Sequence, residues 1–569
     1  MRQLGGVDPQ TGDFSLSPNT PKILIADSIS FSADPGSNGV RAGRVAKACG
    51  KSRASGEDAI EQRVRLADLL IRAKLVTEQD VAKALVRQKE RGGRLGDNLV
   101  ATGAIDQKVL DGFIHRIPPE PNNIVETGID EAVLVALLMK LIYTGRLETV
   151  GQFVEAIKLP VPIVMDLVQK AIERRLLYAL GAREFDSPLS MGYAFTDEGR
   201  RWTLDAIRQS GYVGPAPVTL REFTDRVNLQ KPTNERVTAE RIRSAVSELV
   251  LEDSIVEQVG PALNSGRAIL LYGPPGNGKT SVALSFASVF HDVIYVPYAI
   301  YVEGQIIRFH DPSVHVPLSP VVESEDESHS FIRREMYDLR WISCRRPFVT
   351  TGGELTLEML DLRYDNAGHF YEAPLHMKAL GGCFFIDDFG RQLVGPTHLL
   401  NRWIVPLESR VDFMKLHTGK TFSIPFEELV IFSTNLEPEE LMDPAFLRRL
   451  PYKIEVAPPD LGHYKRIFDA ECRRQGLTLR DEVFNFIVYM LRDGDGPDLA
   501  AFQPRFIVDQ VVATCRFLGR LPELRSPYIE YAINNLRIRR GTGTKPEAQR
   551  PPAPAQQTTR AGQPAGAYQ

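Results

Sequence analysis

One stretch of eight residues has the residue types and the spacing needed to hold phosphate groups. It reads Gly273-Pro274-Pro275-Gly276-Asn277-Gly278-Lys279-Thr280 and is followed by Ser281. In such a loop, glycines let backbone N–H groups turn inward onto phosphate oxygens, a lysine reaches the β- and γ-phosphates, and a threonine hydroxyl ligates Mg²⁺. The stretch therefore predicts a phosphate-binding loop. A glycine-rich turn with an exposed lysine is the alternative interpretation.

Acidic and polar residues follow two later apolar runs. The run 383–386 ends at Asp387 and Asp388, and the run 429–433 is followed by Asn435. The carboxyl ends of parallel strands meet at the ligand crevice of an α/β sheet, so we expect these side chains to lie near the loop. Asp387 would hold Mg²⁺ through water, and Asp388 would orient or deprotonate the attacking water. Asn435 would hydrogen-bond the same water.

Three arginines follow in chain order at the ends of short helical patterns. Arg448 and Arg449 are adjacent, and Arg505 begins a later helical pattern. Solvated surface arginines are the alternative interpretation for each of them. Their position after the phosphate and acid motifs favours a functional role.

The elements that must position these residues are visible in the pattern. Residues 268–272 form a short apolar run suited to a buried parallel strand, and residues 281–290 have helical periodicity. The loop therefore lies between a strand and the N-terminus of a helix, whose dipole favours anions.

Together these parts resemble an AAA+ ATPase module over residues 237–541, about half the chain. The resemblance implies a multidomain α/β protein, with a P-loop αβα sandwich at 237–460 and a helical lid at 461–541. It implies ATP and Mg²⁺ as cofactors and hydrolysis of ATP to ADP and phosphate. The loop corresponds to Walker A, the two aspartates to Walker B and the asparagine to sensor 1. Either member of the arginine pair corresponds to the arginine finger, and the third arginine to sensor 2 on the lid. A finger that reaches a neighbouring subunit implies a homo-oligomeric ring.

Two features depart from the family pattern. Asp388 is one methylene shorter than the usual glutamate, so we expect slow hydrolysis, because misplacing a reacting group by about 1 Å can cost on the order of a hundredfold. Thr280 and Asp387 are 107 positions apart, which leaves room for an insertion. Its acidic run 323–328, its basic-aromatic run 340–346 and its run 350–355 indicate a partner or pore surface, with a solvated loop as the alternative. Residues 410–424 form a hairpin pattern that resembles the hairpin before sensor 1 in MoxR-like AAA+ proteins.

Residues 58–118 contain an internal repeat with an offset of 29 residues, each copy reading helix, turn, helix. It resembles the N-terminal (MshEN-like) domain of type II secretion and MSHA-pilus ATPases, whose two copies can bind cyclic di-GMP. The residues carried over by this resemblance are Arg65, Leu66, Gln88, Arg94, Leu95 and Gly96. Ala67 and Lys74 replace two expected glycines, and Ile117 replaces an expected glutamine. A helical docking module that binds no dinucleotide is the alternative.

Residues 125–212 show three helical patterns, two extended runs and a further helix, an order that resembles a winged helix. Asp166 and Glu173 dilute the basic residues of its third helix, so DNA binding is possible but not favoured. A protein-facing or spacer role is preferred. Residues 213–236, which begin with a Gly-Pro-Ala-Pro sequence, are expected to be a linker.

Composition limits the remaining possibilities. The 569 residues carry a net charge of only −4, so no chain-wide field favours nucleic acid or anionic membrane. Five widely spaced cysteines favour a reducing cytoplasm, and no apolar run reaches the roughly 20 residues of a membrane span. The histidines form no cluster with the spacing of metal ligands. Residues 1–57 and 542–569 have the composition of disordered segments.

The most direct hypothesis is a ring-forming AAA+ ATPase that remodels or assembles an unknown protein client, with N-terminal domains for sensing or docking. A regulatory switch that binds ATP, and cyclic di-GMP as a second ligand, with little turnover is the first alternative. A DNA-linked ATPase that uses the winged helix is the second. A secretion motor is disfavoured because the arginines and the Gly-Pro-Pro-Gly loop suit AAA+ proteins better.

Overall fold

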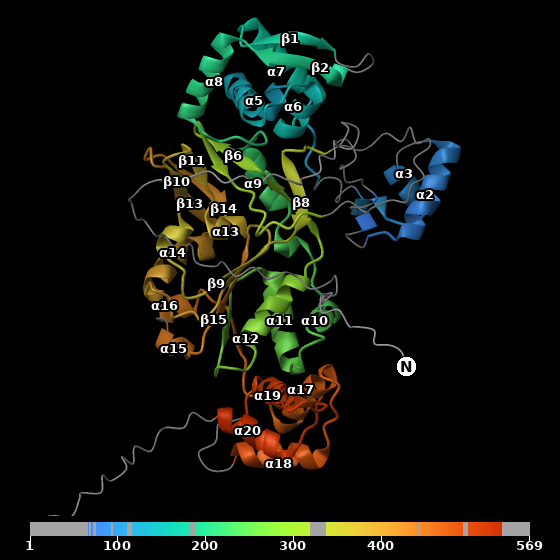
Figure 1. The fold of residues 1–569 in the computed structure, drawn as a ribbon, viewed down its shortest axis with the longest axis vertical. Helices are drawn as coiled ribbons and strands as arrows, with labels where there is room; N and C mark the ends of the chain where they lie inside the picture. Colours follow the sequence, from blue (N-terminus) through green and yellow to red (C-terminus); the bar gives the residue numbers. More distant parts are fainter. Residues whose placement is uncertain are drawn as a thin grey trace, which may run out of the picture. The chain divides into compact units, whose positions relative to one another are not determined.

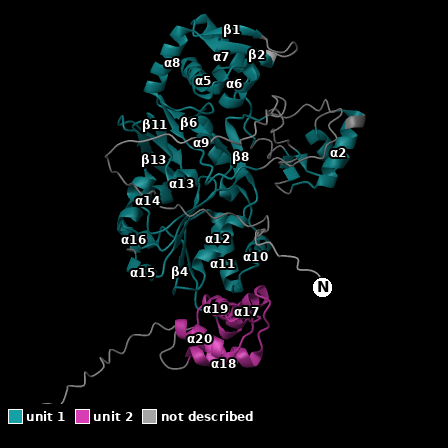
Figure 2. Ribbon diagram, viewed as in Figure 1, with its two compact units in different colours: residues 1–459 teal, residues 460–569 magenta. Residues whose placement is uncertain are grey.

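The structure is a computed structural model of the chain, and its described residues form two compact units (Figure 2). The described residues are 67, 70–71, 75–92, 95–107, 109–110, 117–182, 188–318, 337–441, 444–492 and 499–536. The segments predicted to be disordered, 1–57 and 542–569, lie outside them. The larger unit ends at Pro459 and the smaller begins at Asp460.

A five-stranded parallel sheet forms the centre of the nucleotide-binding candidate region. Its strands, in spatial order, are β16 (Tyr452–Glu455), β4 (Ile269–Tyr272), β15 (Leu429–Ser433), β12 (Cys383–Ile386) and β9 (Phe348–Thr351). The apolar runs predicted around 268–272, 383–386 and 429–433 are therefore adjacent strands. The protein is a mixed α/β structure, as predicted.

Both faces of this sheet are covered by helices, which is why its strands are continuously apolar. Phe384 and Ile386 belong to the same buried cluster as Trp403 of α14 (Pro396–Ser409). The alternate residues Cys383 and Phe385 instead belong to a cluster shared with α11 (Asp253–Ser265) and α12 (Lys279–Ser285). Figure 1 shows α14 on one side of the sheet and α11 and α12 on the other. α10 (Ala239–Ala245) packs on α11, whereas α15 (Pro438–Leu441) and α16 (Pro444–Leu447) precede β16.

A second, mixed five-stranded sheet is built from the predicted insertion and from residues before the loop. In spatial order it contains β10 (Arg363–Asp365), β11 (Phe370–Glu372), β7 (Gln305–Arg308), β6 (Ala299–Val302) and β3 (Val218–Thr219). An antiparallel ribbon, β5 (Val293–Pro297) with β8 (Trp341–Arg345), accompanies it. The insertion is thus largely folded, although its acidic run 323–328 lies outside the described residues.

The segment 213–236, expected to be a linker, instead contributes a strand and a helix. β3 pairs with β6, and α9 (Leu220–Leu229) follows it directly. Thr219 and Glu222 form a capping box at the start of α9, while Phe223 and Val227 are buried in the core of the second sheet. The Gly-Pro pattern at 214–217 only precedes this packed element.

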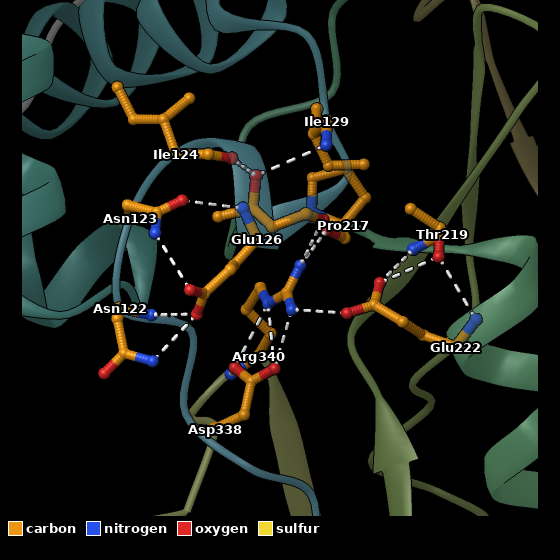
Figure 3. A network of polar contacts seen from close by, with 11 residues as sticks. Asn122, Asn123, Ile124, Glu126, Ile129, Pro217, Thr219, Glu222, Asp338 and Arg340 are labelled. Carbon is orange, nitrogen blue, oxygen red and sulfur yellow. Dashed lines mark hydrogen bonds and ion pairs between the residues drawn. The ribbon is translucent and has the colours of Figure 1, made fainter.

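Arg340 is the centre of a buried polar network rather than part of an exposed basic surface (Figure 3). Its side chain is 1% exposed, and its Nε donates to both carboxylate oxygens of Asp338 at 3.1 and 3.0 Å. Nη1 donates to the carbonyls of Thr127 and Pro217 at 3.1 and 3.2 Å, and Nη2 donates to Glu222 at 2.9 Å. The run 340–346 was predicted to be a partner or pore surface, and this is wrong for its buried members Arg340, Trp341 and Arg346. Apart from Asp338, the partners of the two arginines come from distant segments, which the local sequence does not reveal.

The hairpin predicted at 410–424 is present as β13 (Val411–Lys415) and β14 (Thr421–Pro425). Its turn contacts the second sheet. Lys420 Nζ lies 2.7 Å from Glu303 Oε2 in the turn between β6 and β7, and the backbone N–H of His417 donates to the Tyr371 hydroxyl at 2.9 Å.

The predicted order of elements in residues 125–212 is also observed. It comprises α5 (Glu131–Gly145), α6 (Val150–Ile157), α7 (Val161–Glu173), the hairpin β1 (Leu177–Ala182) with β2 (Met191–Phe195), and α8 (Asp197–Gln209). Lys140 is buried within this region at 3% exposure, and its Nζ donates to the Ser210 carbonyl at 2.8 Å. Burial lowers the pKa of Lys140 to about 8.

The repeat region and the smaller unit are helical where they are described. Helix α2 (Glu78–Arg91) begins at a Thr77–Asp80 capping box and is followed by α3 (Leu95–Ala101). The smaller unit contains α17 (Leu461–Arg474), α18 (Asp481–Arg492), α19 (Gln503–Phe517) and α20 (Ser526–Leu536), which share one buried core. Among the described helices, none combines the length and the apolar character needed to cross a bilayer.

Candidate functional site

The phosphate-loop candidate connects β4 directly to α12, in the predicted strand–loop–helix context. Its three glycines all have positive φ, with values of 127° at Gly273, 82° at Gly276 and 89° at Gly278. At Gly273 a side chain is also sterically excluded, because a Cβ atom would lie 2.8 Å from the carbonyl oxygen of Val456. The glycines are therefore required by the path of the backbone.

Lys279 lies at the centre of this loop. Its side chain is 6% exposed, and its Nζ donates to the carbonyls of Gly273 and Pro274, both at 2.9 Å. Burial lowers the pKa of Lys279, while the nearby Asp387 and Asp388 carboxylates act in the opposite direction. The loop thus encloses a lysine side chain within its own backbone and beside two acids.

The remaining loop residues differ in exposure. Asn277 is buried, whereas Pro274, Pro275, Gly276 and Ser281 are exposed. This exposed rim leaves part of the loop open to solvent.

The two predicted acids and the predicted polar residue meet at the loop. Thr280 Oγ1 donates to Asp387 Oδ2 at 2.9 Å, and the backbone N–H of Asp388 donates to Asp387 Oδ1 at 3.0 Å. Asn435 Nδ2 donates to Asp388 Oδ1 at 3.1 Å. The structure therefore joins residues from β12, β15 and α12 in one continuous set of hydrogen bonds at the carboxyl edge of the sheet.

Asp388 has a strained backbone conformation, with φ of +48°. A non-glycine residue in this left-handed region costs roughly 1–2 kcal/mol, although aspartate and asparagine tolerate it better than most residues. Its side chain is exposed, in contrast to the buried strand that precedes it. Such strain in a candidate site points to a conformational requirement of the side chain.

Two residues near the acids were not predicted to belong to the site: Glu354, from the run 350–355 interpreted as a partner or pore surface, and Gln392. Glu354 follows β9, and its Oε1 accepts hydrogen bonds from Thr351 Oγ1 at 3.0 Å and from the Gly352 N–H at 2.8 Å. Gln392 follows the acidic turn and donates to backbone carbonyls around it. The rule that polar residues follow sheet strands at their carboxyl ends could have found Glu354, whereas Gln392 has no such signal.

The two adjacent arginines, Arg448 and Arg449, differ in their contacts and exposure. Arg449 Nε lies 2.6 Å from Glu408 Oε1 of α14, and its side chain is 18% exposed. Arg448 is exposed and forms no ion pair with any residue that the structure describes. Arg505 belongs to the smaller unit, where its side chain is 70% exposed and lies 3.7 Å from Asp509.

The candidate dinucleotide residues are only partly described. Arg65, Leu66 and Arg94 lie outside the described residues. Gln88 lies on α2, and Leu95 and Gly96 lie on α3. A Cβ atom at Gly96 would approach Leu110 Cδ2 to 3.0 Å, so close packing between helices already explains this glycine.

A family model described as a domain of unknown function (DUF8689) matches residues 460–535, which lie within the smaller unit. No curated protein matches the chain. Among solved structures, domain III of the replication initiation protein DnaA from Thermotoga maritima is similar at 13% identity, over 51% of this chain and 95% of that domain, with a TM-score of 0.30.

Proposed function

We propose that the chain binds ATP with Mg²⁺ at residues 273–280 and hydrolyses it. The observation that carries the proposal is the continuous set of contacts from Thr280 through Asp387 and Asp388 to Asn435, beside the enclosed Lys279. A structural glycine turn would not require the lysine and hydroxyl of α12 to meet two carboxylates that follow β12 and an amide that follows β15. This combination fits a site for a phosphate chain and a metal ion.

The residues have distinct roles in this proposal. When the nucleotide binds, the Lys279 ammonium group replaces its hydrogen bonds to the loop carbonyls with hydrogen bonds to phosphate oxygens. An ammonium group forms stronger hydrogen bonds with anionic acceptors than with neutral ones. The Thr280 hydroxyl and the Asp387 carboxylate are adjacent hard oxygen donors, the type that Mg²⁺ prefers. A bound Mg²⁺ would neutralise phosphate charge. Asp388 orients or deprotonates the attacking water, and Asn435 fixes the position of the Asp388 carboxylate.

The proposal extends to an AAA+ type ring with Arg448 as the residue that reaches a neighbouring subunit. Arg448 is preferred over Arg449 because it is exposed and unpaired within the described chain, whereas Arg449 is bound to Glu408. Arg505 remains the sensor-2 candidate. The ring would act on a protein client, with the N-terminal regions used for docking or sensing.

Measurement of ATP binding and turnover at several protein concentrations tests this proposal. A fluorescent ATP analogue should bind the full chain in Mg²⁺ and lose affinity at least tenfold in Lys279→Ala, because the lysine contributes a charge-assisted contact to phosphate. Turnover per chain should rise with protein concentration as rings form, and Arg448→Ala should lower it more than Arg449→Ala. Absence of saturable binding by the wild-type chain would contradict the proposed site.

A switch that binds ATP with negligible turnover is the second candidate, and the conformation of Asp388 favours it. The residue is short for the role of water-orienting acid and has a left-handed backbone. Tight ATP binding without phosphate release at any protein concentration would identify the switch. An Asp388→Asn variant that traps ATP should retain a client in co-purification only if the ring proposal is correct.

DNA-linked activity is not proposed, because two basic residues at the C-terminal end of α7 form ion pairs with an acidic side chain. Lys170 and Arg174 lie 3.7 and 2.8 Å from Glu131 of α5. For residues 58–118, binding of cyclic di-GMP stays a prediction. Titration of labelled cyclic di-GMP with the full chain tests it, and no saturable binding at micromolar protein would leave helical docking as the role of this region.

A further inference from the structure

The side chain of Gln392 forms hydrogen bonds with the backbone around Asp388. It is 9% exposed, and its Nε2 lies 3.2 Å from the Asp387 carbonyl, 3.3 Å from the Asp388 carbonyl and 3.4 Å from the Gly352 carbonyl. Its Oε1 accepts a hydrogen bond from the Gly390 N–H at 2.8 Å. A primary amide offers two N–H donors and one acceptor oxygen, so both ends of this side chain are used on one turn and its neighbour.

The turn that Gln392 contacts is attached to the end of β15 on its other side. Phe389 is 1% exposed, its N–H donates to the Ser433 carbonyl at 2.6 Å, and its carbonyl accepts from Thr434 Oγ1 at 2.8 Å. Asp388 therefore lies between two fixed points, the buried Phe389 and the β12 strand end. Its left-handed φ persists only if surrounding contacts offset the conformational cost.

Gln392 also connects this turn to the end of β9. The Gly352 carbonyl that it approaches belongs to the turn in which the Gly352 N–H holds the Glu354 carboxylate. β9 and β12 are neighbouring parallel strands, with Thr351 in register with Ile386. One amide thus joins the turns that follow two adjacent strands and carry Glu354 and Asp388.

We infer that Gln392 is a positioning residue, which holds Asp388 in its left-handed conformation and thereby directs the Asp388 carboxylate toward the attacking water. This inference rests on the proposed function, because it concerns the same hydrolytic site. Gln392 acts through Asp388 and takes no part in binding the nucleotide. Its removal should therefore lower the rate of hydrolysis without weakening ATP affinity.

Gln392→Glu tests the donor role with little change in shape. An ionised carboxylate can still accept from the Gly390 N–H, but it cannot donate to the three carbonyls and is repelled by them. We expect kcat to fall on the order of 10- to 100-fold, since a misplacement of about 1 Å has this effect, while KM and the dissociation constant for a fluorescent ATP analogue change less than about twofold.

Gln230→Glu is the matched control. Gln230 is also buried, at 6% exposure, and its amide bonds both the carbonyl and the N–H of Tyr295 in a region without candidate site residues. Turnover is normalised to the amount of folded chain that binds the ATP analogue. The control should lose stability, yet keep its normalised kcat.

The outcomes separate the inference from the proposed function. If the wild-type chain hydrolyses ATP and Gln392→Glu has the same kcat, the positioning role is wrong and the proposed hydrolysis stands. Parallel loss of kcat and ATP affinity also overturns it, because Gln392 would then support the whole site. A wild-type chain that binds ATP but never releases phosphate contradicts the proposed hydrolysis, and the positioning role falls with it.

Discussion

Replacement of Arg340 by methionine should destabilise the larger unit strongly. Methionine preserves much of the side-chain volume but leaves the Asp338 carboxylate, which is 2% exposed, without its cation. It also removes the donors to the Thr127 and Pro217 carbonyls. Loss of one partner from a buried ion pair typically costs about 3–5 kcal/mol, so we expect a loss in this range.

The effect should depend on pH. Burial raises the pKa of Asp338, and the adjacent Arg340 opposes this rise. Without the arginine, the folded-state pKa of Asp338 moves further above its unfolded value. The protonated form then favours folding at acidic pH, and this contribution is lost as the pH rises through the folded-state pKa. The destabilisation caused by Arg340→Met should therefore be larger at pH 7 than at pH 4. Adding Asp338→Asn to the Arg340→Met variant should restore part of the lost stability at pH 7.

Urea unfolding followed by tryptophan fluorescence measures this effect. Trp341 is adjacent to Arg340 and 3% exposed, and the chain has only two other tryptophans, Trp202 and Trp403. Trp202 and Trp403 can each be replaced by phenylalanine, so that the unfolding transition reported by Trp341 can be assigned. Arg221→Met is the matched control, because Arg221 is 92% exposed and lies 3.9 Å from Asp225. An exposed pair contributes at most about 1 kcal/mol. An Arg340→Met loss as small as that of the control would refute the reasoning.

Three other changes test individual groups. Lys140→Met should stabilise the chain at pH 7 by at most about 3 kcal/mol, the free energy that separates a folded-state pKa of about 8 from an unfolded value of about 10.4. Between these two pKa values the unfolded chain binds more protons at Lys140 than the folded chain does, so the stability of the wild type should rise from pH 8 to 10. The greater stability of the variant should therefore disappear over this range, and thermal unfolding measures both effects. Both carboxyl oxygens of Glu428 are buried and have no hydrogen-bond partner from another residue in the described structure, and burial raises its pKa well above the usual range. Wild-type stability should therefore decline as pH rises toward that folded-state pKa, and Glu428→Gln should remove this decline in thermal unfolding, whereas Glu427→Gln should not. Asp388→Asn should retain ATP affinity but lower kcat by about 10²-fold or more, because asparagine tolerates a left-handed φ yet cannot act as a base; a kcat near the wild-type value would exclude Asp388 as the water-orienting acid.

The sequence predicted those parts of the site that depend on local pattern. The glycine loop, the strand before it and the acids after 383–386 follow from short runs, and their meeting follows from the geometry of parallel strands. The role of Gln392 was not predictable, since it contacts backbone carbonyls, which every residue type supplies. Arg340 was misinterpreted because its partners Thr127 and Pro217 are 213 and 123 positions away. A basic side chain in a linear sequence gives no indication that distant carbonyls surround it.

The linker interpretation of 213–236 failed for a related reason. β3 is only two residues long, too short to show strand periodicity, and its partner β6 lies on the far side of the phosphate loop in the sequence. α9 was overlooked because the preceding Gly-Pro-Ala-Pro sequence is typical of a boundary. The spacing of Phe223 and Val227, four residues apart, is typical of the buried face of a helix and could have predicted α9.

The pairing of β3 with β6 determines where this chain can be shortened for experiments. Val218 is fully buried and pairs with Ile300, and Thr219 pairs with Tyr301. A fragment that begins at residue 237, where the motifs alone place the start of the nucleotide module, would lack this edge strand and α9. It would expose the β6 edge and the apolar surface that Phe223 covers, and exposed strand edges promote aggregation. A fragment meant for biochemistry should therefore begin before Val218, even though every candidate catalytic residue lies beyond Tyr272.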